Sequence, residues 1–223
     1  MEAKLPIRKL MRAALFYDLG VRDYREVWDF QKELVERRIA GEIPDTVIFC
    51  EHFPVFTIGK HGGHDNIRSG ENLLEIPIYE VERGGNITFH GLGQLVAYFI
   101  FKVQDVHEFT HEILQSGVDL LSEYGISAYI KKGYPGVWVG DEKIASVGIA
   151  VRKWITFHGI AINVNVDLRY FDMIVPCGIQ GVKMTSLEKI IGRKISMDEV
   201  KEIYRGKLEK NLKVQFVEEA LRL

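Results

Sequence analysis

The stretch GVWVGDEKIASVGIAVRKWITFHGIAINVNVD, residues 136–167, decides the fold class of this chain. It consists of runs in which Val, Ile, Trp and Phe alternate with small or polar residues, which is typical of β-strands. Gly140 and Asp141 separate two of these runs and are residue types that tight hairpin turns prefer. The stretch therefore predicts consecutive strands joined by a hairpin.

Other strand-like segments and two amphipathic helices precede this stretch. One helical pattern begins at Tyr24 and ends before Gly41, a typical C-terminal stop, and a second covers residues 107–126. Two strong helices provide too few crossovers for a parallel sheet of this many strands. We therefore expect an α+β fold in which mixed or antiparallel sheets are flanked by helices. The expected strands before the hairpin are residues 12–19, 46–52, 55–59, 76–83, 94–101 and 127–132.

The C-terminal segment, residues 196–223, differs in character. Ser196 and Glu199 form an S-x-x-E capping box, which is a signature of a helix start. The helix that follows has a charged outer face and an apolar stripe, so we expect it to pack on one side only. We interpret it as a helical segment within a single domain, residues 1–223. The stripe consists of Val200, Ile203, Tyr204 and Leu208.

Composition excludes several classes of protein. The chain has 223 residues, is 47% hydrophobic and has a formal charge of -2, so it can bury a large core but lacks the clustered basic surface that nucleic-acid binding requires. No stretch reaches the roughly 18 apolar residues of a membrane span. Arg12 and Asp18 interrupt the apolar part of the N-terminal segment, which argues against a secretory signal. We expect a cytoplasmic protein with no nucleic-acid or membrane partner.

The two cysteines have different sequence contexts. Cys50 lies in TVIFCEH, a buried-strand pattern in which free cysteine acts as a small hydrophobic residue. Cys177 lies between Pro176 and Gly178, where a substrate carbonyl could approach closely, but a bystander cysteine in a loop is an equally good interpretation at this point. A nucleophilic thiol with a pKa near its usual value of about 8.5 also needs a neighbouring cation or base.

Several residues are candidates for that role. Lys143 follows the hairpin turn and enters an apolar run, although a strand-edge lysine that reaches out to solvent is the simpler interpretation. His90 and His158 each precede a glycine, which suits a ligand contact or a structural hydrogen bond equally. His61, His64 and Asp65 lack a second ligand pair at zinc-like spacing, so we predict no metal site. The segment RGGNITFHGLGQ matches no phosphate-binding loop, and no G-x-S-x-G nucleophile motif is present.

RGGNITFHGLGQL resembles the R-G-G-x-x-T-x-H-G-P-G-Q signature of the octanoyltransferases of lipoate biosynthesis. The stretch from residue 136 to the P-C-G-I run at Cys177 is similar to further motifs of that family, in the same order, and the resemblance covers residues 12–190. Leu92 stands where the family usually has proline. The resemblance implies an α+β fold similar to that of the biotin and lipoate protein ligases.

The resemblance also implies site residues. Cys177 corresponds to the family's acyl-accepting cysteine and Lys143 to its lysine partner. Two segments would line the acyl channel from opposite sides: Arg83, Gly84, Gly85, Asn86, Ile87, Thr88, Phe89 and His90 on one, and Ser146, Val147, Gly148, His158, Gly159 and Ile160 on the other. We expect backbone N–H groups near Gly178 and in residues 146–148 to stabilise an oxyanion.

The activity implied by the resemblance is ATP-independent transfer of an octanoyl or lipoyl group, with no cofactor and no metal. The donor would be octanoyl-acyl carrier protein, and the acceptor a lysine on the lipoyl domains of 2-oxoacid dehydrogenases or on the glycine-cleavage H protein, through a thioester on Cys177. An ATP-dependent lipoate or biotin ligase, a thiol hydrolase and a non-enzymatic binding module are the alternatives. We also expect Lys131, Lys132, Arg152 and Lys153 to form a docking patch for the acidic carrier.

Overall fold

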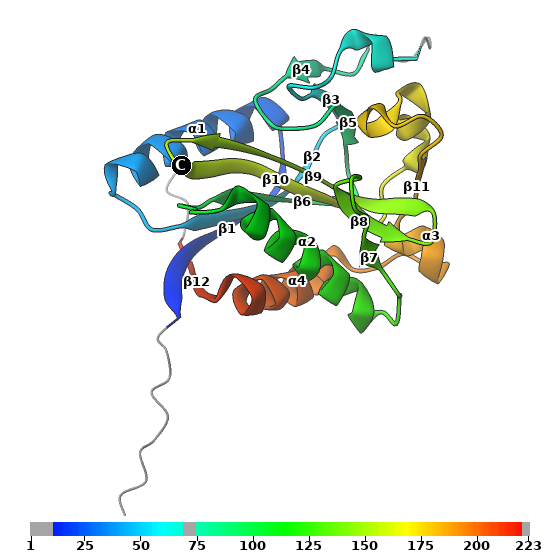
Figure 1. The fold of residues 1–223 in the computed structure, drawn as a ribbon. Helices are drawn as coiled ribbons and strands as arrows, with labels where there is room; N and C mark the ends of the chain where they lie inside the picture. The colour runs from blue at the N-terminus through cyan, green and yellow to red at the C-terminus, as the bar shows by residue number, and fades with distance from the viewer. Residues whose placement is uncertain (1–10, 69–74, 220–223) are drawn as a thin grey trace, which may run out of the picture.

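The computed structural model describes residues 11–68 and 75–219, and a sheet of nine strands forms its centre (Figure 1). A separate sheet of three strands lies beside it. The strands of the central sheet run in the order β12 (Val214–Glu218), β1 (Arg12–Arg22), β2 (Thr46–His52), β6 (Gln94–Ile100), β10 (Ile155–Asn163), β9 (Glu142–Arg152), β8 (Gly136–Val139) and β7 (Tyr129–Ile130), with β11 (Lys183–Met184) paired to β9. The small sheet has the order β4 (Ile78–Glu80), β3 (Val55–Ile58) and β5 (Ile87–His90).

Strand directions in both sheets are mixed. In the central sheet β1 runs parallel to β2 and β12, and β11 runs parallel to β9, whereas the pairs from β2 through β6, β10, β9 and β8 to β7 are antiparallel. In the small sheet β3 pairs parallel with β4 and antiparallel with β5. The expected α+β class with mixed sheets is confirmed.

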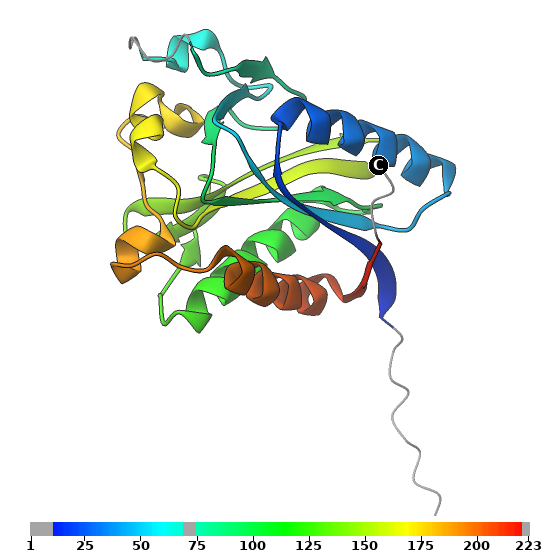
Figure 2. The same ribbon diagram turned by 180° about the vertical axis from the view of Figure 1, so that it is seen from behind.

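Helices cover both faces of the central sheet (Figures 1 and 2). Helix α1 (Tyr24–Ala40) lies on one face, and α2 (Val106–Glu123) and α4 (Met197–Leu212) lie together on the other. Gly41 ends α1 in a left-handed conformation, φ 79°, as the sequence predicts. The remaining helical segments are α3 (Leu187–Ile191) and the 3-10 turns η1 (His64–Asn66), η3 (Leu168–Met173) and η4 (Pro176–Gly178).

The predicted hairpin is present between β8 and β9. Val139 pairs with Glu142, so the turn consists of Gly140 and Asp141 alone, and Gly140 has the positive φ, 56°, that such a turn requires. The adjoining pair of β9 and β10 keeps an unbroken register over eight residue pairs. The stretch that decides the fold thus forms the long central strands of the sheet.

The C-terminal segment is not wholly helical, which corrects the prediction for residues 196–223. Lys213 ends α4 in a left-handed conformation, with a φ of 56°. Strand β12 then pairs parallel with β1 at the sheet edge. Residues 220–223 lie outside the described part. The capping box is also only half formed. Ser196 Oγ accepts from the Glu199 N–H at 3.4 Å, but the Glu199 carboxylate accepts from the Tyr124 hydroxyl instead.

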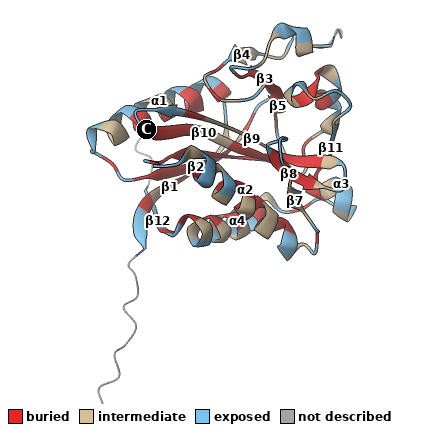
Figure 3. Ribbon diagram, in the orientation of Figure 1, coloured by how far each residue is buried: buried red, intermediate tan, exposed pale blue. Residues whose placement is uncertain are grey.

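Burial follows the layers of the fold (Figure 3). One core lies between the sheet and the helices α2 and α4, and a second lies under α1. Cys50 belongs to the second core and is fully buried, as predicted. Within the described ranges, no helix combines the length and apolarity that crossing a membrane would need.

Candidate active site

Lys143 and Cys177 meet at the end of β9. Lys143 Nζ donates a hydrogen bond to Cys177 Sγ across 3.1 Å, and the Ser146 hydroxyl lies 3.8 Å from the same sulfur. Only 1% of Lys143 is exposed, so the interpretation of this residue as a lysine reaching out to solvent is wrong. The Lys143 amine is therefore held in contact with a thiol that is itself only half-buried.

A constrained turn presents the Cys177 side chain. Pro176 begins the 3-10 turn η4, and Cys177 follows with φ 58° and ψ 13°, a left-handed conformation that non-glycine residues adopt at a cost. The N–H of Gly178 donates to the Val175 carbonyl at 2.9 Å. A side chain at Gly178 would meet Asn86 Nδ2 at 2.5 Å. Glycine is thus needed for the turn to pack against the R-G-G-N segment.

A bulge and a glycine shape the backbone around Lys143. The β8–β9 register shifts between Val137 and Trp138, so that Ile144 is an extra residue on β9. Across the pair, Gly136 has a φ of 146°, and a Cβ there would lie 2.3 Å from Lys143 Cε. The lysine stem thus occupies the space that the missing side chain leaves.

The two reacting candidates border a cavity of about 200 Å³ beneath the R-G-G-N segment. Most predicted channel residues line it, and both predicted sides contribute. These are Arg83, Gly85, Asn86, Thr88, His90, Ser146, Val147, Gly148, His158, Gly159 and Ile160.

Gly84, Ile87 and Phe89 are not among the residues that line the cavity, which corrects part of the predicted set. Ile87 and Phe89 pack in the core of the small sheet because alternate residues of β5 face opposite sides. Gly84 instead uses its N–H and carbonyl to bridge Ile149 and Arg83. Sequence reasoning missed Tyr24, Val96, Tyr98, Gly133, Tyr134, Pro135, Ala161 and Ile179, of which only Val96 and Tyr98 carried a signal, the alternation along β6.

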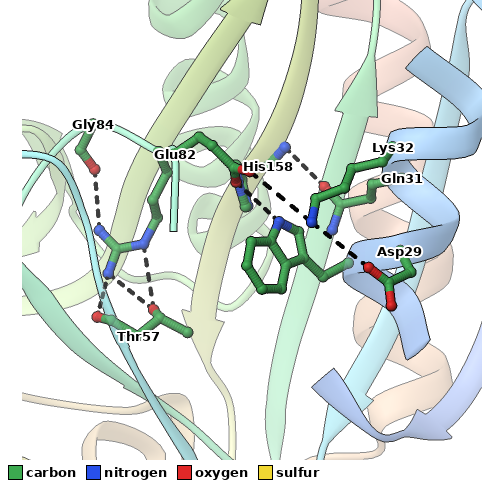
Figure 4. A network of polar contacts seen from close by, with 9 residues as sticks. Asp29, Gln31, Lys32, Thr57, Glu82, Gly84 and His158 are labelled. Carbon is green, nitrogen blue, oxygen red and sulfur yellow. Dashed lines mark hydrogen bonds and ion pairs between the residues drawn. The ribbon is translucent and has the colours of Figure 1, made fainter. Parts of the chain in front are cut away.

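His158 is held by two hydrogen-bond partners at the cavity wall (Figure 4). Its Nε2 lies 3.3 Å from Glu82 Oε2, its backbone N–H donates to Gln31 Oε1 at 2.8 Å, and its φ is 60°. Trp28 Nε1 donates to the same Glu82 oxygen at 2.9 Å. The bond from His158 lowers the pKa of Glu82 to about 2, whereas burial lowers the pKa of His158. His158 is therefore neutral and held by Glu82 and Gln31.

Arg83 and His90 also have structural partners within the cavity wall. The Arg83 guanidinium donates to the carbonyl and hydroxyl of Thr57 and to the Gly84 carbonyl (Figure 4). His90 Nδ1 lies 2.8 Å from Gln94 Oε1, and burial lowers the pKa of His90 to about 3. Among the described residues, no histidine is placed within hydrogen-bond distance of Cys177 Sγ.

Comparison with known proteins supports this architecture. A family model described as the lipoyl protein ligase A/B catalytic domain matches residues 23–209. The chain belongs to this family. An octanoyltransferase of Dictyoglomus turgidum is 46% identical over 181 residues, covering 80% of this chain and 78% of its own. An octanoyltransferase of a Thermoanaerobacter species is 44% identical over 215 residues, covering 93% and 94%.

Solved structures share the fold of this lipoyl protein ligase A/B family member at low identity. A bi-partite lipoate protein ligase from Thermoplasma acidophilum superposes with a TM-score of 0.73 at 16% identity, covering 94% of this chain and 88% of its own. A biotin protein ligase from Aquifex aeolicus gives 0.50 at 17% identity, covering 92% and 70%. The expected similarity to the biotin and lipoate ligase fold is confirmed.

The predicted basic docking patch is not brought together in this family member. Ile130, next to Lys131, pairs through Val137 to Ala145, whereas Arg152 lies seven residues further along β9, about 23 Å at 3.3 Å per residue. Arg152 is also paired with Glu36 on α1. Lys131 lies instead beside the aromatic rings of Tyr134, which lines the cavity, and Trp138. In the part of the chain that is described, no group of three His, Cys, Asp or Glu side chains could hold a metal ion.

Proposed function

We propose that this chain is an octanoyltransferase that forms a thioester on Cys177 and then passes the acyl group to a lysine amine. The observation that carries the proposal is the 3.1 Å contact of Lys143 Nζ with Cys177 Sγ at the edge of the cavity. The names of relatives at 44–46% identity support the acyl group. The match over residues 23–209 supports a single acyltransferase domain.

In the first half-reaction, the Cys177 thiolate attacks the carbonyl carbon of an acyl thioester. The ammonium group of Lys143, 3.1 Å from the sulfur, stabilises this thiolate. The tetrahedral intermediate collapses as the bond to the donor sulfur breaks, and Lys143 gives its proton to the departing thiolate. One thioester replaces another, and Lys143 is left neutral.

In the second half-reaction, the neutral Lys143 acts as a general base. The acceptor lysine amine, with a usual pKa of about 10.4, first loses one proton to solvent and attacks the Cys177 thioester as the neutral amine, whose nitrogen must then lose a second proton. Lys143 takes that proton as the amide forms, and Cys177 leaves as a thiolate. The pair returns to its starting state. The net reaction converts a thioester to an amide and requires no ATP.

The oxyanion donors differ in part from those expected. The N–H groups of Gly178 and Ile179 already donate to the carbonyls of Val175 and Pro176 within the turn, so neither is free for a substrate oxygen. The Ser146 hydroxyl, 3.8 Å from Cys177 Sγ, is the group that we assign as a donor to the substrate oxygen. We assign the developing negative charge to this side of the sulfur.

Donor and acceptors follow from the same proposal. The donor is octanoyl-acyl carrier protein, and the acceptors are the lipoyl domains of 2-oxoacid dehydrogenases and the glycine-cleavage H protein. The reaction takes place in the cytoplasm, where reducing conditions keep the Cys177 thiol free. A thiol hydrolase is disfavoured, because that chemistry requires a histidine base at the sulfur, and the sulfur's neighbours here are Lys143 and Ser146.

The test is intact-protein mass spectrometry after mixing with octanoyl-acyl carrier protein without ATP. We expect one octanoyl adduct on the wild type, discharged by a lipoyl domain, no adduct on Cys177→Ser, and a strongly slowed adduct on Lys143→Ala. Cys50→Ala and Lys189→Ala are matched controls, since Cys50 is buried in the core and Lys189 pairs with Glu142 at the surface. Acylation of the lipoyl domain only when ATP and free octanoate are supplied would instead establish a ligase.

A further inference from the structure

Two buried amide side chains next to the strands that line the cavity have no role in the proposed reaction. Gln94 on β6 and Asn163 on β10 are direct partners in the antiparallel pair, and each is only 1% exposed. Gln94 Nε2 donates to Asn163 Oδ1 at 2.9 Å and to the Phe89 carbonyl at 3.1 Å. Both come from motifs that the sequence singles out, H-G-L-G-Q and N-V-N-V.

The contacts of Asn163 continue to the lysine. Asn163 Nδ2 donates to the Thr185 carbonyl at 3.0 Å, and the Thr185 N–H donates to the Lys143 carbonyl at 3.0 Å. Met184, next to Thr185, is the register partner of Lys143 in the short parallel pair of β11 with β9. We call Gln94, Asn163 and the backbone of Thr185 the amide relay. It connects the β6–β10 pair to the backbone of Lys143.

The same segment also carries the other reacting candidate. Residues 183–185 follow the turn of Cys177 after only a few residues, so the position of this segment limits where the thiol can lie. Held against β9, it keeps the Cys177 turn and Lys143 on one rigid frame. Released, it would allow the turn and the strand to move apart.

Burial explains why the relay fixes one geometry. A buried amide that loses its partner is left with an unsatisfied polar group, which destabilises the fold, so each group of the relay is tied to the next. The orientation of Gln94 is also set from the other side, because its Oε1 accepts from His90 Nδ1 at 2.8 Å. Each side-chain amide atom of Gln94 and Asn163 has a hydrogen-bond partner, and buried amides satisfied in this way favour a single arrangement over its alternatives.

We propose that Asn163 is a positioning residue for the transfer reaction: by holding Thr185 against Lys143, it sets the contact between Lys143 Nζ and Cys177 Sγ. This inference rests on the proposed function, because it assumes that these two groups react. It predicts that the loss of Asn163 slows the chemical step while donor binding is preserved, since among the described residues the Asn163 side chain bonds only to Gln94 and Thr185.

Asn165 provides a matched control. It lies two residues further along the chain and also makes two side-chain hydrogen bonds, donating to the Ile195 carbonyl at 2.8 Å and accepting from the Ile195 N–H at 2.9 Å. These bonds hold the start of the C-terminal segment and do not reach Thr185 or Lys143. Asn165→Ala therefore also removes two side-chain hydrogen bonds between the chain after β10 and a later segment, here Ile195.

The experiment compares Asn163→Ala, Gln94→Leu, Asn165→Ala and Lys143→Ala in the full chain. It measures single-turnover acylation of Cys177 by octanoyl-acyl carrier protein, the steady-state kcat and donor KM, and the thermal midpoint. A displacement of reacting groups by about 1 Å costs on the order of 10²-fold, so we expect acylation by Asn163→Ala to fall about 10- to 100-fold with donor KM within about twofold of wild type. Gln94→Leu should fall in the same direction by less.

The outcomes separate the inference from the proposed function. Asn165→Ala should lose thermal stability but acylate at the wild-type rate. If Asn163→Ala acylates as fast as Asn165→Ala, the positioning role is wrong although the Lys143–Cys177 reaction stands. If Lys143→Ala itself acylates at the wild-type rate, the proposed function fails first. Should Asn163→Ala not fold, Gln94→Leu makes the same comparison, and an unchanged acylation rate there overturns the inference.

Discussion

Cys50 and Cys177 show what one side chain becomes in two regions of the same molecule. Cys50 lies inside strand β2, is fully buried, and has His52 Nε2 at 3.4 Å. Cys177 lies on a left-handed turn at the edge of a cavity, half-buried, with Lys143 Nζ at 3.1 Å. A neighbouring nitrogen base is therefore present at both thiols.

The difference lies in access and in the charge of the neighbour. Burial raises the pKa of the Cys50 thiol and lowers that of His52 to about 4, so both groups of this pair stay neutral at pH 7. The lysine beside Cys177 can instead supply a positive charge next to a sulfur that substrate can reach. Proximity of a base alone does not make a nucleophile.

Alkylation should give the largest contrast between the two thiols. We expect iodoacetamide to modify Cys177 rapidly in the folded protein and Cys50 roughly 10³-fold more slowly, because reaction at Cys50 requires opening of the sheet core. Peptide mass spectrometry of timed samples measures both rates in one reaction. Cys177→Ser should remove the fast phase and leave the slow one. Comparable rates at the two cysteines would contradict the distinction.

Displacing the Lys143 amine should impair the reaction at Cys177 and leave Cys50 unaffected. A Cβ at position 136 would lie 2.3 Å from Lys143 Cε and 2.4 Å from the Ala145 carbonyl. We therefore expect Gly136→Ala to lower kcat for octanoyl transfer by about 10²-fold, the usual cost of misplacing a reacting group by about 1 Å.

Gly140→Ala is the control for that substitution. Gly140 has a positive φ, 56°, in the same hairpin, but nothing lies within 4 Å of a Cβ built there. It shares the backbone strain without the contact to Lys143, so its kcat should stay close to wild type. Equal losses in the two variants would mean that hairpin strain, and not the position of Lys143, controls the rate.

The sequence predicts the strands and the reacting pair better than it predicts their surroundings. The alternation in residues 136–167 and the Gly140–Asp141 turn suffice for β8, β9 and β10, because period and turn chemistry are local properties. The parallel pairing of β12 with β1 could not be predicted, because it joins Arg12 to Val214 and such a distant pairing produces no local sequence pattern.

Resemblance to a family added what local pattern could not. The residues around Lys143 favour a solvent-directed lysine, and only the matching family motif assigns it to Cys177. The faces of β5 show the converse limit. If every residue of the R-G-G-N-I-T-F-H motif lined the channel, Ile87 and Phe89 would face it. Alternate side chains of β5 point to opposite sides, so these two residues pack in the core of the small sheet instead. The relay through Asn163 joins residues distant in sequence, so no spacing rule finds it.

The smallest expected effect concerns His52, the neighbour of Cys50, and changes the stability of the fold instead of catalysis. His52 is neutral in the fold because burial lowers its pKa to about 4, and its ring bonds the Arg22 carbonyl and the Tyr98 hydroxyl. The unfolded chain, with a histidine pKa of about 6.5, binds more protons between pH 6.5 and 4. The free energy of unfolding should therefore fall as pH drops through this window, by up to about 1 kcal/mol per pH unit from His52.

Urea denaturation from pH 7.5 to 4.5 checks this, with His52→Gln as the comparison, because glutamine does not titrate. The variant should start less stable at pH 7.5 and lose less stability toward pH 4.5, so that the two curves converge. Burial, and after it the neighbouring His52, lowers the pKa of His90 to about 3, so His90 contributes in both proteins and contributes less in the variant, which adds to the same difference. Parallel curves would show that His52 takes up its proton without unfolding. Solvent would then reach the Cys50 region in the folded protein, which contradicts the difference in access between Cys50 and Cys177.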